Sequence, residues 1–164
     1  HDFGKHSVFV HNKVMGQTET YYLKNFRANL KELMEDRGVN SEKLGKGIGI
    51  NPSTIRRWFY DRDPKAESVR RVADYFGCSA DFLFGLSPEF EPRRNNHPTN
   101  FYTRYTFLAR AAGMTDHAVA KACGVGRGTV SKWKSGRMPE LYILLQLCNL
   151  FGCGFEYLIG ISDD

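Results

Sequence analysis

The feature that most constrains this chain is an internal duplication. When the sequence is shifted by 75 positions, residues 26–87 align with residues 101–162 without a gap, and 15 of the 62 positions are identical. The agreement is clearest near the end of each copy, where Phe-Gly-Cys at 76–78 meets Phe-Gly-Cys at 151–153. A long unit that occurs only twice predicts two tandem domains of one fold and not a solenoid.

The segment between the copies, residues 88–100, has the composition of a linker. It holds three prolines and three asparagines but only one large apolar residue, Phe90. Fully extended, such a segment spans roughly 40 Å. We therefore expect an N-terminal arm over residues 1–20, a first domain over 21–87, a linker over 88–100 and a second domain over 101–164.

Each copy has the hydrophobic periodicity of about five short helices. In the first copy, one apolar face indicates a helix that ends at Gly38, and further helices end at Gly49 and Gly77. The last predicted helix covers residues 80–84. The expected N-caps are Asn40 and Asn51 in the first copy and Thr115 and Gly126 in the second. We expect an all-α fold of two five-helix domains.

The most informative segment is the pair of short helices around Gly49 and Gly124. Two helices that cross through a turn of three or four residues need a small residue in the first helix and a glycine in the turn. The small residue is Gly45 in the first copy and Ala120 in the second. Further along, Trp58 and Trp133 have apolar spacing with Ile55 and Val130, which indicates that the tryptophans belong to the core.

These residues resemble the phage Cro/repressor-type helix-turn-helix family, also called the xenobiotic-response-element-like family. The resemblance covers about residues 22–87 and 101–162. It implies lambda-repressor-like domains in a DNA-binding transcriptional regulator, which we expect to be a cytoplasmic repressor of bacterial, phage or mobile-element origin. The pattern is fullest in the second copy, where it runs through Thr115, Val119, Ala120, Gly124, Val125, Thr129, Val130, Trp133, Gly136 and Pro139.

The copies depart from the family pattern in four places. Gly45 stands where alanine is usual, and Asp61 stands where a glycine follows the tryptophan. In the second copy, Gly126 and Gly128 fall at the start of the recognition helix. Each interior glycine lowers helix stability by about 1 kcal/mol, so we expect the start of this helix to become ordered only on DNA. Asp116 puts a negative charge where the family touches the DNA backbone, where it either caps its own helix or weakens the grip.

The resemblance implies that the third helix of each copy enters the major groove. Arginine there suits the bidentate geometry of guanine O6 and N7. Carried over by position, the base-reading residues are Pro52, Ser53, Arg57, Arg127, Gly128 and Lys132. The residues expected to contact the DNA backbone are Asn40, Ser41, Arg56, Tyr60, Arg62, Thr115, Lys134, Ser135 and Arg137.

Other classes of function find little support in the sequence. The formal charge of +5 and a pI near 9.1 favour a polyanionic partner but do not by themselves establish one. The cysteines form no CxxC pair and the histidines no HxxxH pair, so we expect buried, reduced thiols and no metal or cofactor. We find no catalytic constellation, no small-molecule site and no membrane-spanning run, and expect a soluble, intracellular protein that is not an enzyme.

The first 20 residues fit no helix. Residues 7–14 have strand character and residues 15–17 suit a turn. This segment is either an arm that pairs with a partner or, before Met15, sequence that is not native.

Three interpretations of function remain open. In the first, both copies bind double-stranded DNA and read adjacent half-sites. In the second, the better-capped first copy reads DNA, while the second reads or forms a homodimer through an extra apolar face over residues 144–151. In the third, the fold is a protein-binding module that sequesters a toxin or another regulator.

Overall fold

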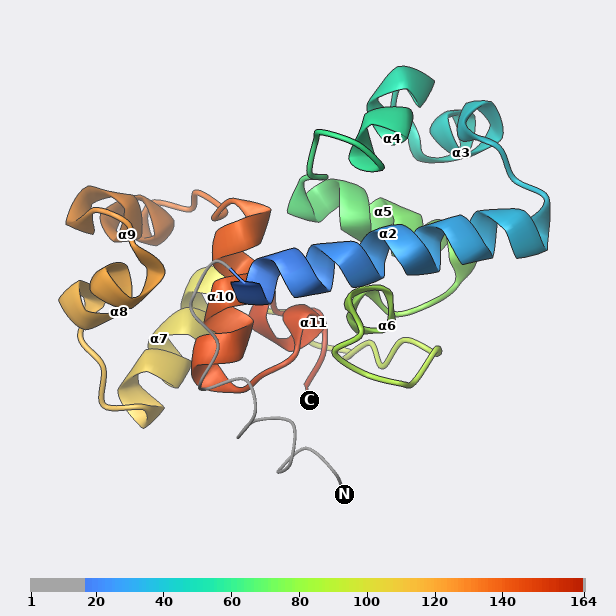
Figure 1. Cartoon of the computed structure of the whole chain (residues 1–164). Helices are drawn as coiled ribbons and strands as arrows, with labels where there is room; N and C mark the ends of the chain where they lie inside the picture. Colours follow the sequence, from blue (N-terminus) through green and yellow to red (C-terminus); the bar gives the residue numbers. More distant parts are fainter. Residues whose placement is uncertain (1–16, 164) are drawn as a thin grey trace. The chain divides into compact units, whose positions relative to one another are not determined.

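The computed structural model describes residues 17–163, and within them the chain is all α-helical, which confirms the predicted fold class (Figure 1). The described residues divide into two compact units, one over Thr20–Pro92 and one that covers residues 93–163. The described residues contain five helices for each copy, as the periodicity predicts. No strand is found between residues 17 and 163.

The first copy folds into helices whose ends follow its capping residues. Asn40 Oδ1 accepts a hydrogen bond from the Lys43 amide at 2.8 Å, and Asn51 Oδ1 accepts one from the Ser53 amide at 2.9 Å. Between them Gly49 ends a helix with a φ of +71°, a left-handed conformation that favours glycine. The helices are α2 (Gln17–Arg37), α3 (Ser41–Ile48), α4 (Pro52–Trp58), α5 (Ala66–Phe76) and α6 (Ala80–Phe84).

The start of α2 corrects the expected boundary of the N-terminal arm. Residues 17–20 are helical, although the sequence suggested an arm over residues 1–20 and a turn that includes Gln17. Glutamine and glutamate are good helix formers, so Gln17 and Glu19 extend the helix outward from its apolar part. The strand expected over residues 7–14 lies outside the described residues.

The second copy repeats the plan with a different cap on its recognition helix. Thr115 and Gly126 are the N-caps, as predicted: Thr115 Oγ1 accepts a hydrogen bond from the Ala118 amide at 3.1 Å, whereas Gly126 has no side chain that could accept one. As the N-cap, Gly126 precedes the helix, so only Gly128 carries the penalty of an interior glycine. The helices are α7 (Phe101–Ala111), α8 (Asp116–Cys123), α9 (Arg127–Lys134), α10 (Leu141–Phe151) and α11 (Phe155–Leu158).

A buried tryptophan lies at the centre of each core. The Trp58 ring packs edge-on against Phe26 with ring centroids 6.3 Å apart, and only 1% of the residue is exposed. In the second copy Trp133, 2% exposed, packs edge-on against Phe101 and Tyr105 at 5.5 and 5.2 Å. The two tryptophans are therefore core residues, as their apolar spacing predicted, and each contributes about 3–5 kcal/mol relative to alanine.

The apolar run on α10 is not the exposed face that the sequence suggested. Leu144, Leu145, Leu147 and Cys148 are all buried, and Leu150 and Phe151 are half-buried. A helix that is apolar on every side is stable only when it is buried on every side. This run therefore offers no exposed apolar face for the dimer that the sequence suggested.

Each end of the predicted linker, residues 88–100, packs against the copy that it adjoins. The Phe90 carbonyl accepts a hydrogen bond from the Ser79 amide at 2.8 Å, and the Phe90 ring packs against Phe82. At its other end the Thr99 amide donates to the Gly160 carbonyl at 2.9 Å.

No helix in the described part of the chain combines the length and apolar character needed to cross a bilayer. No disulfide joins the four cysteines, of which Cys78, Cys123 and Cys148 are buried. Across residues 17–163, no three metal-ligating side chains gather into a site.

Gly45 yields a test of the packing between α3 and α4. A Cβ at this position would collide with the Ile50 carbonyl oxygen and lie 3.2 Å from Pro52 Cγ. We expect Gly45→Ala to lower the unfolding free energy of the first copy by about 1–2 kcal/mol, because the clash outweighs alanine's better helix propensity. The midpoint of thermal unfolding, followed by circular dichroism, measures the effect.

Gly128→Ala is the matched control, since nothing lies within 4 Å of its Cβ position in α9. This variant should raise the midpoint through helix propensity alone. A Gly45→Ala protein that melts at or above the parental midpoint would show that α3 and α4 accommodate the extra methyl group.

Candidate nucleic-acid interface

In both copies the third helix turns one face to the core and the other to solvent. Ile55 and Trp58 of α4 are buried, whereas Ser53, Arg56 and Arg57 are exposed. The second copy has the same arrangement, with Val130 and Trp133 of α9 buried and a polar outer face. The buried tryptophan thus fixes which side chains face outward.

The predicted base-reading residues lie on the outer faces of these two helices. Ser53 and Arg57 are four residues apart and so share one face of α4, and Gly128 and Lys132 share the corresponding face of α9. Pro52 is half-buried at the first position of α4, while Arg127 is exposed at the first position of α9. A helix with such a face fits the major groove, which admits a single α-helix.

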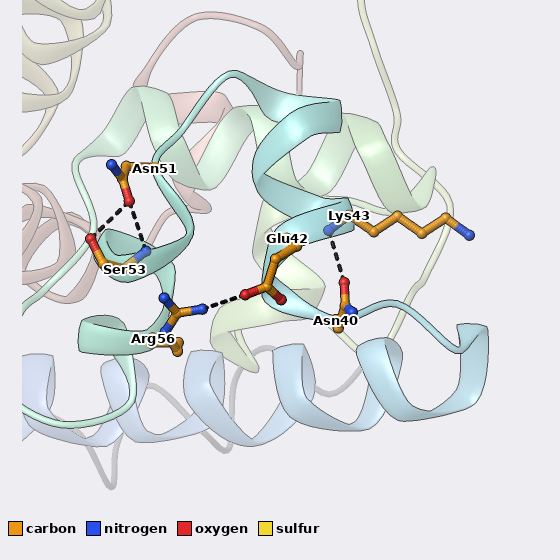
Figure 2. A network of polar contacts seen from close by, with 6 residues as sticks. All are labelled: Asn40, Glu42, Lys43, Asn51, Ser53 and Arg56. Carbon is orange, nitrogen blue, oxygen red and sulfur yellow. Dashed lines mark hydrogen bonds and ion pairs between the residues drawn. The ribbon is translucent and has the colours of Figure 1, made fainter.

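The exposed arginines of α4 are held by carboxylates of their own copy. Arg56 Nη1 lies 2.8 Å from Glu42 Oε1 on α3, as Figure 2 shows. Arg57 donates twice to Asp61, from Nε at 3.0 Å and from Nη2 at 3.2 Å. The hydrogen bonds between Arg57 and Asp61 lower the pKa of the Asp61 carboxyl and raise the pKa of the Arg57 guanidinium.

Glu42 lies at the start of α3, where the sequence predicts a contact with the DNA backbone. Its own backbone N–H and then Arg56 lower the pKa of its carboxyl, so it stays ionised. Asn40, in front of it, already uses its side chain to cap the helix (Figure 2). An anion of the protein therefore lies where a phosphate is expected.

The exposed cations on and beside α9 differ from those of α4. Within residues 17–163, no carboxylate forms an ion pair with Arg127, Lys132, Lys134 or Arg137, and all four are exposed. The second copy therefore presents positive charge without a neighbouring counter-charge.

Asp116 neither caps its helix nor faces a cation. Thr115 is the N-cap of α8, and an Asp116 carboxylate oxygen accepts a hydrogen bond from the Tyr105 hydroxyl at 2.6 Å. Burial, and then this hydrogen bond, raise the pKa of Tyr105. The carboxylate expected to disturb the DNA backbone contact is thus engaged by the core.

The remaining residues predicted to contact the DNA backbone lie at the edges of the two helix pairs. Tyr60 is 83% exposed beyond the end of α4, and Ser135 ends α9 with its hydroxyl donating to the Lys132 carbonyl at 2.8 Å. Asn40, Arg62, Thr115, Lys134 and Arg137 are also exposed, and Ser41 is half-buried. They flank the outer faces of α4 and α9 in the chain.

Arg27 positions α4, although no pattern in the sequence points to it. Arg27 on α2 donates from Nε to the Trp58 carbonyl at 2.7 Å and pairs through Nη2 with Asp63 at 2.8 Å. In the sequence Arg27 is an ordinary surface cation, and its counterpart in the second copy is Tyr102. Glu42 was missed for the same reason, whereas Asp61 was visible as a departure from glycine four residues after Arg57.

Two short helices joined through a left-handed glycine, with the second anchored by a buried tryptophan and polar on its outer face, define a helix-turn-helix domain of the DNA-binding class. A family model described as Helix-turn-helix matches residues 30–83 and 108–158. The chain belongs to this family of DNA-binding regulators, of the Cro/repressor type, and carries two tandem copies. No curated protein and no solved structure matches the chain significantly.

The Arg27 contact predicts a loss of stability that does not depend on DNA. Arg27→Met keeps the aliphatic stem but leaves the Trp58 carbonyl without this charged donor, so we expect the first copy to lose about 1.5–3 kcal/mol of unfolding free energy. Urea unfolding followed by tryptophan fluorescence measures it.

Asp63→Asn separates the two contacts of Arg27, because it removes only the exposed ion pair. This control should cost less than about 1 kcal/mol. Equal losses in both variants would show that the ion pair, and not the bond to the helix end, is what matters.

Proposed function

We propose that this chain is a sequence-specific transcriptional repressor that occupies an operator by placing α4 and α9 in the major groove. The observation that supports the proposal most is the outer face of each helix. It is polar and cationic, and the buried Trp58 or Trp133 holds it in one orientation. A preorganised helix of this kind loses little entropy when it enters the groove.

Two arginines are the proposed readers of guanine. Arg57, on the outer face of α4, and Arg127, at the start of α9, each carry a planar fork that matches O6 and N7. Lys132 supplies a single cation on α9. Ser53 and the Pro52 ring are small, and Gly128 has no side chain, so the backbone of each helix can approach the base edges closely.

The flanking residues position each helix on the phosphates. The amides at the start of α3 and α8, behind Asn40, Ser41 and Thr115, favour an anion. Exposed cations and hydroxyls beside the helices add contacts that carry no sequence information; they are Arg56, Tyr60, Arg62, Lys134, Ser135 and Arg137. Two copies on one chain supply what a dimer supplies, two helices for half-sites roughly 34 Å apart.

Selection of bound sites from random DNA tests the proposal. We expect one sequence to be enriched, and we expect Arg57→Ala and Arg127→Ala each to relax the preference at a different guanine. Each variant should weaken binding to the enriched site by about 10- to 150-fold, since a bidentate contact is worth about 1–3 kcal/mol.

Arg110→Ala, which removes an exposed cation from α7, is the control and should keep the parental preference. If the parent enriches no sequence, the regulator is not sequence-specific. If both arginine variants keep the parental preference, these arginines do not read the bases. A reporter promoter with the enriched site across its start should fall in activity when the chain is expressed.

The salt dependence of binding to random duplex distinguishes DNA binding from a protein-binding module. Each phosphate contact contributes a slope of about −0.9 to the plot of log K against log salt. We expect a slope steeper than about −3, from several contacts at once. A flat dependence would favour the protein-binding interpretation.

A further inference from the structure

The two copies share a scaffold but differ in the charges around their recognition helices. Between residues 40 and 64 five lysines and arginines are opposed by three acidic residues, a net charge of +2. Between residues 115 and 139 five are opposed by one, a net charge of +4. The number of cations is equal, so the difference lies in the carboxylates.

Two of those carboxylates are the partners of the α4 arginines. Glu42 pairs with Arg56 at 2.8 Å, and Asp61 pairs with Arg57 at 3.0 Å. In the aligned positions of the second copy, His117 replaces Glu42 and Gly136 replaces Asp61. The second copy therefore has neither acid.

The Arg57 pair uses the edge of the guanidinium that DNA would need. Nε and Nη2 both donate to Asp61, and a fork of two parallel donors is also what guanine or a phosphate engages. Arg57 must exchange Asp61 for the DNA. Exposed ion pairs are weak and exchange readily, since the side chains of Arg57 and Asp61 are 52% and 63% exposed. The exchange is favourable only where the DNA offers an equally good partner.

We propose that the two copies have different roles in DNA binding. The second copy supplies the sequence-independent affinity for DNA. In the first copy, Glu42 and Asp61 act as specificity-determining residues that weaken its binding to duplexes without its site. This inference rests on the proposed function. It keeps the first copy as the selective reader and assigns the stronger binding to random duplex to the second.

Removal of the charges of Glu42 and Asp61 tests whether these carboxylates weaken non-specific DNA binding. The Glu42→Gln/Asp61→Asn variant frees two guanidiniums for phosphates, so random duplex should bind about tenfold more tightly and the salt slope should steepen by about 1.8. The ratio of affinities for enriched and random DNA should fall. Fluorescence anisotropy with a random-sequence duplex measures both, and circular dichroism confirms that the variant is folded.

The matched control removes the same two charges from α2. Glu32→Gln/Glu35→Gln changes the net charge equally, and neither carboxylate forms an ion pair within residues 17–163, so random duplex should bind within about threefold of the parent. If this control tightens binding as much as the α3–α4 variant, or if the α3–α4 variant binds no more tightly than the parent, the inference is overturned.

A comparison of variants in the two copies tests which copy supplies the non-specific affinity for DNA. Arg57→Ala/Asp61→Ala removes one whole ion pair without changing the net charge, and should lose more affinity for the enriched site than for random duplex. Lys132→Ala should weaken binding to random duplex severalfold. Equal weakening by the two would overturn the inference, whereas a parent without salt-dependent DNA binding would contradict the proposed function itself.

Discussion

The burial of one tryptophan at the end of each recognition helix is the interaction on which the rest of the structure depends. Trp58 and Trp133 are large and almost fully buried, and each packs edge-on against an aromatic ring, so rotation of α4 or α9 about its axis would expose it. That penalty fixes the opposite face toward solvent. The outward position of the candidate contact residues therefore follows from the core.

A duplicated scaffold with a conserved core leaves the surface free to diverge. The core positions of the two copies keep their character, but the surface around α4 carries acids that the surface around α9 lacks. Because non-specific affinity for DNA is electrostatic, a few carboxylates change it without any change of fold. One chain thus holds two versions of the same domain that differ in the charges around their recognition helices.

Much of the fold was predictable because short-range signals determine it. Asn40, Asn51 and Thr115 cap helices where the sequence places them, and the left-handed glycines end helices where they were expected. The predictions that failed were those in which a local sequence preference was overridden by the rest of the helix or by tertiary packing. Gln17 continued a helix instead of forming a turn, and the apolar α10 run was buried instead of exposed.

The sequence by itself determined the duplication, the helical class, the central tryptophans and the positions of the recognition helices, because periodicity and capping act within a few residues. Only the tertiary structure decided the state of the charges. Glu42 and Arg56 lie 14 positions apart and meet only when α3 packs beside α4. Arg27 reaches the end of α4 from 31 positions away, and Asp116 is engaged by a core tyrosine. Side-chain partners of exposed groups depend on which helices are neighbours, and no local pattern encodes that.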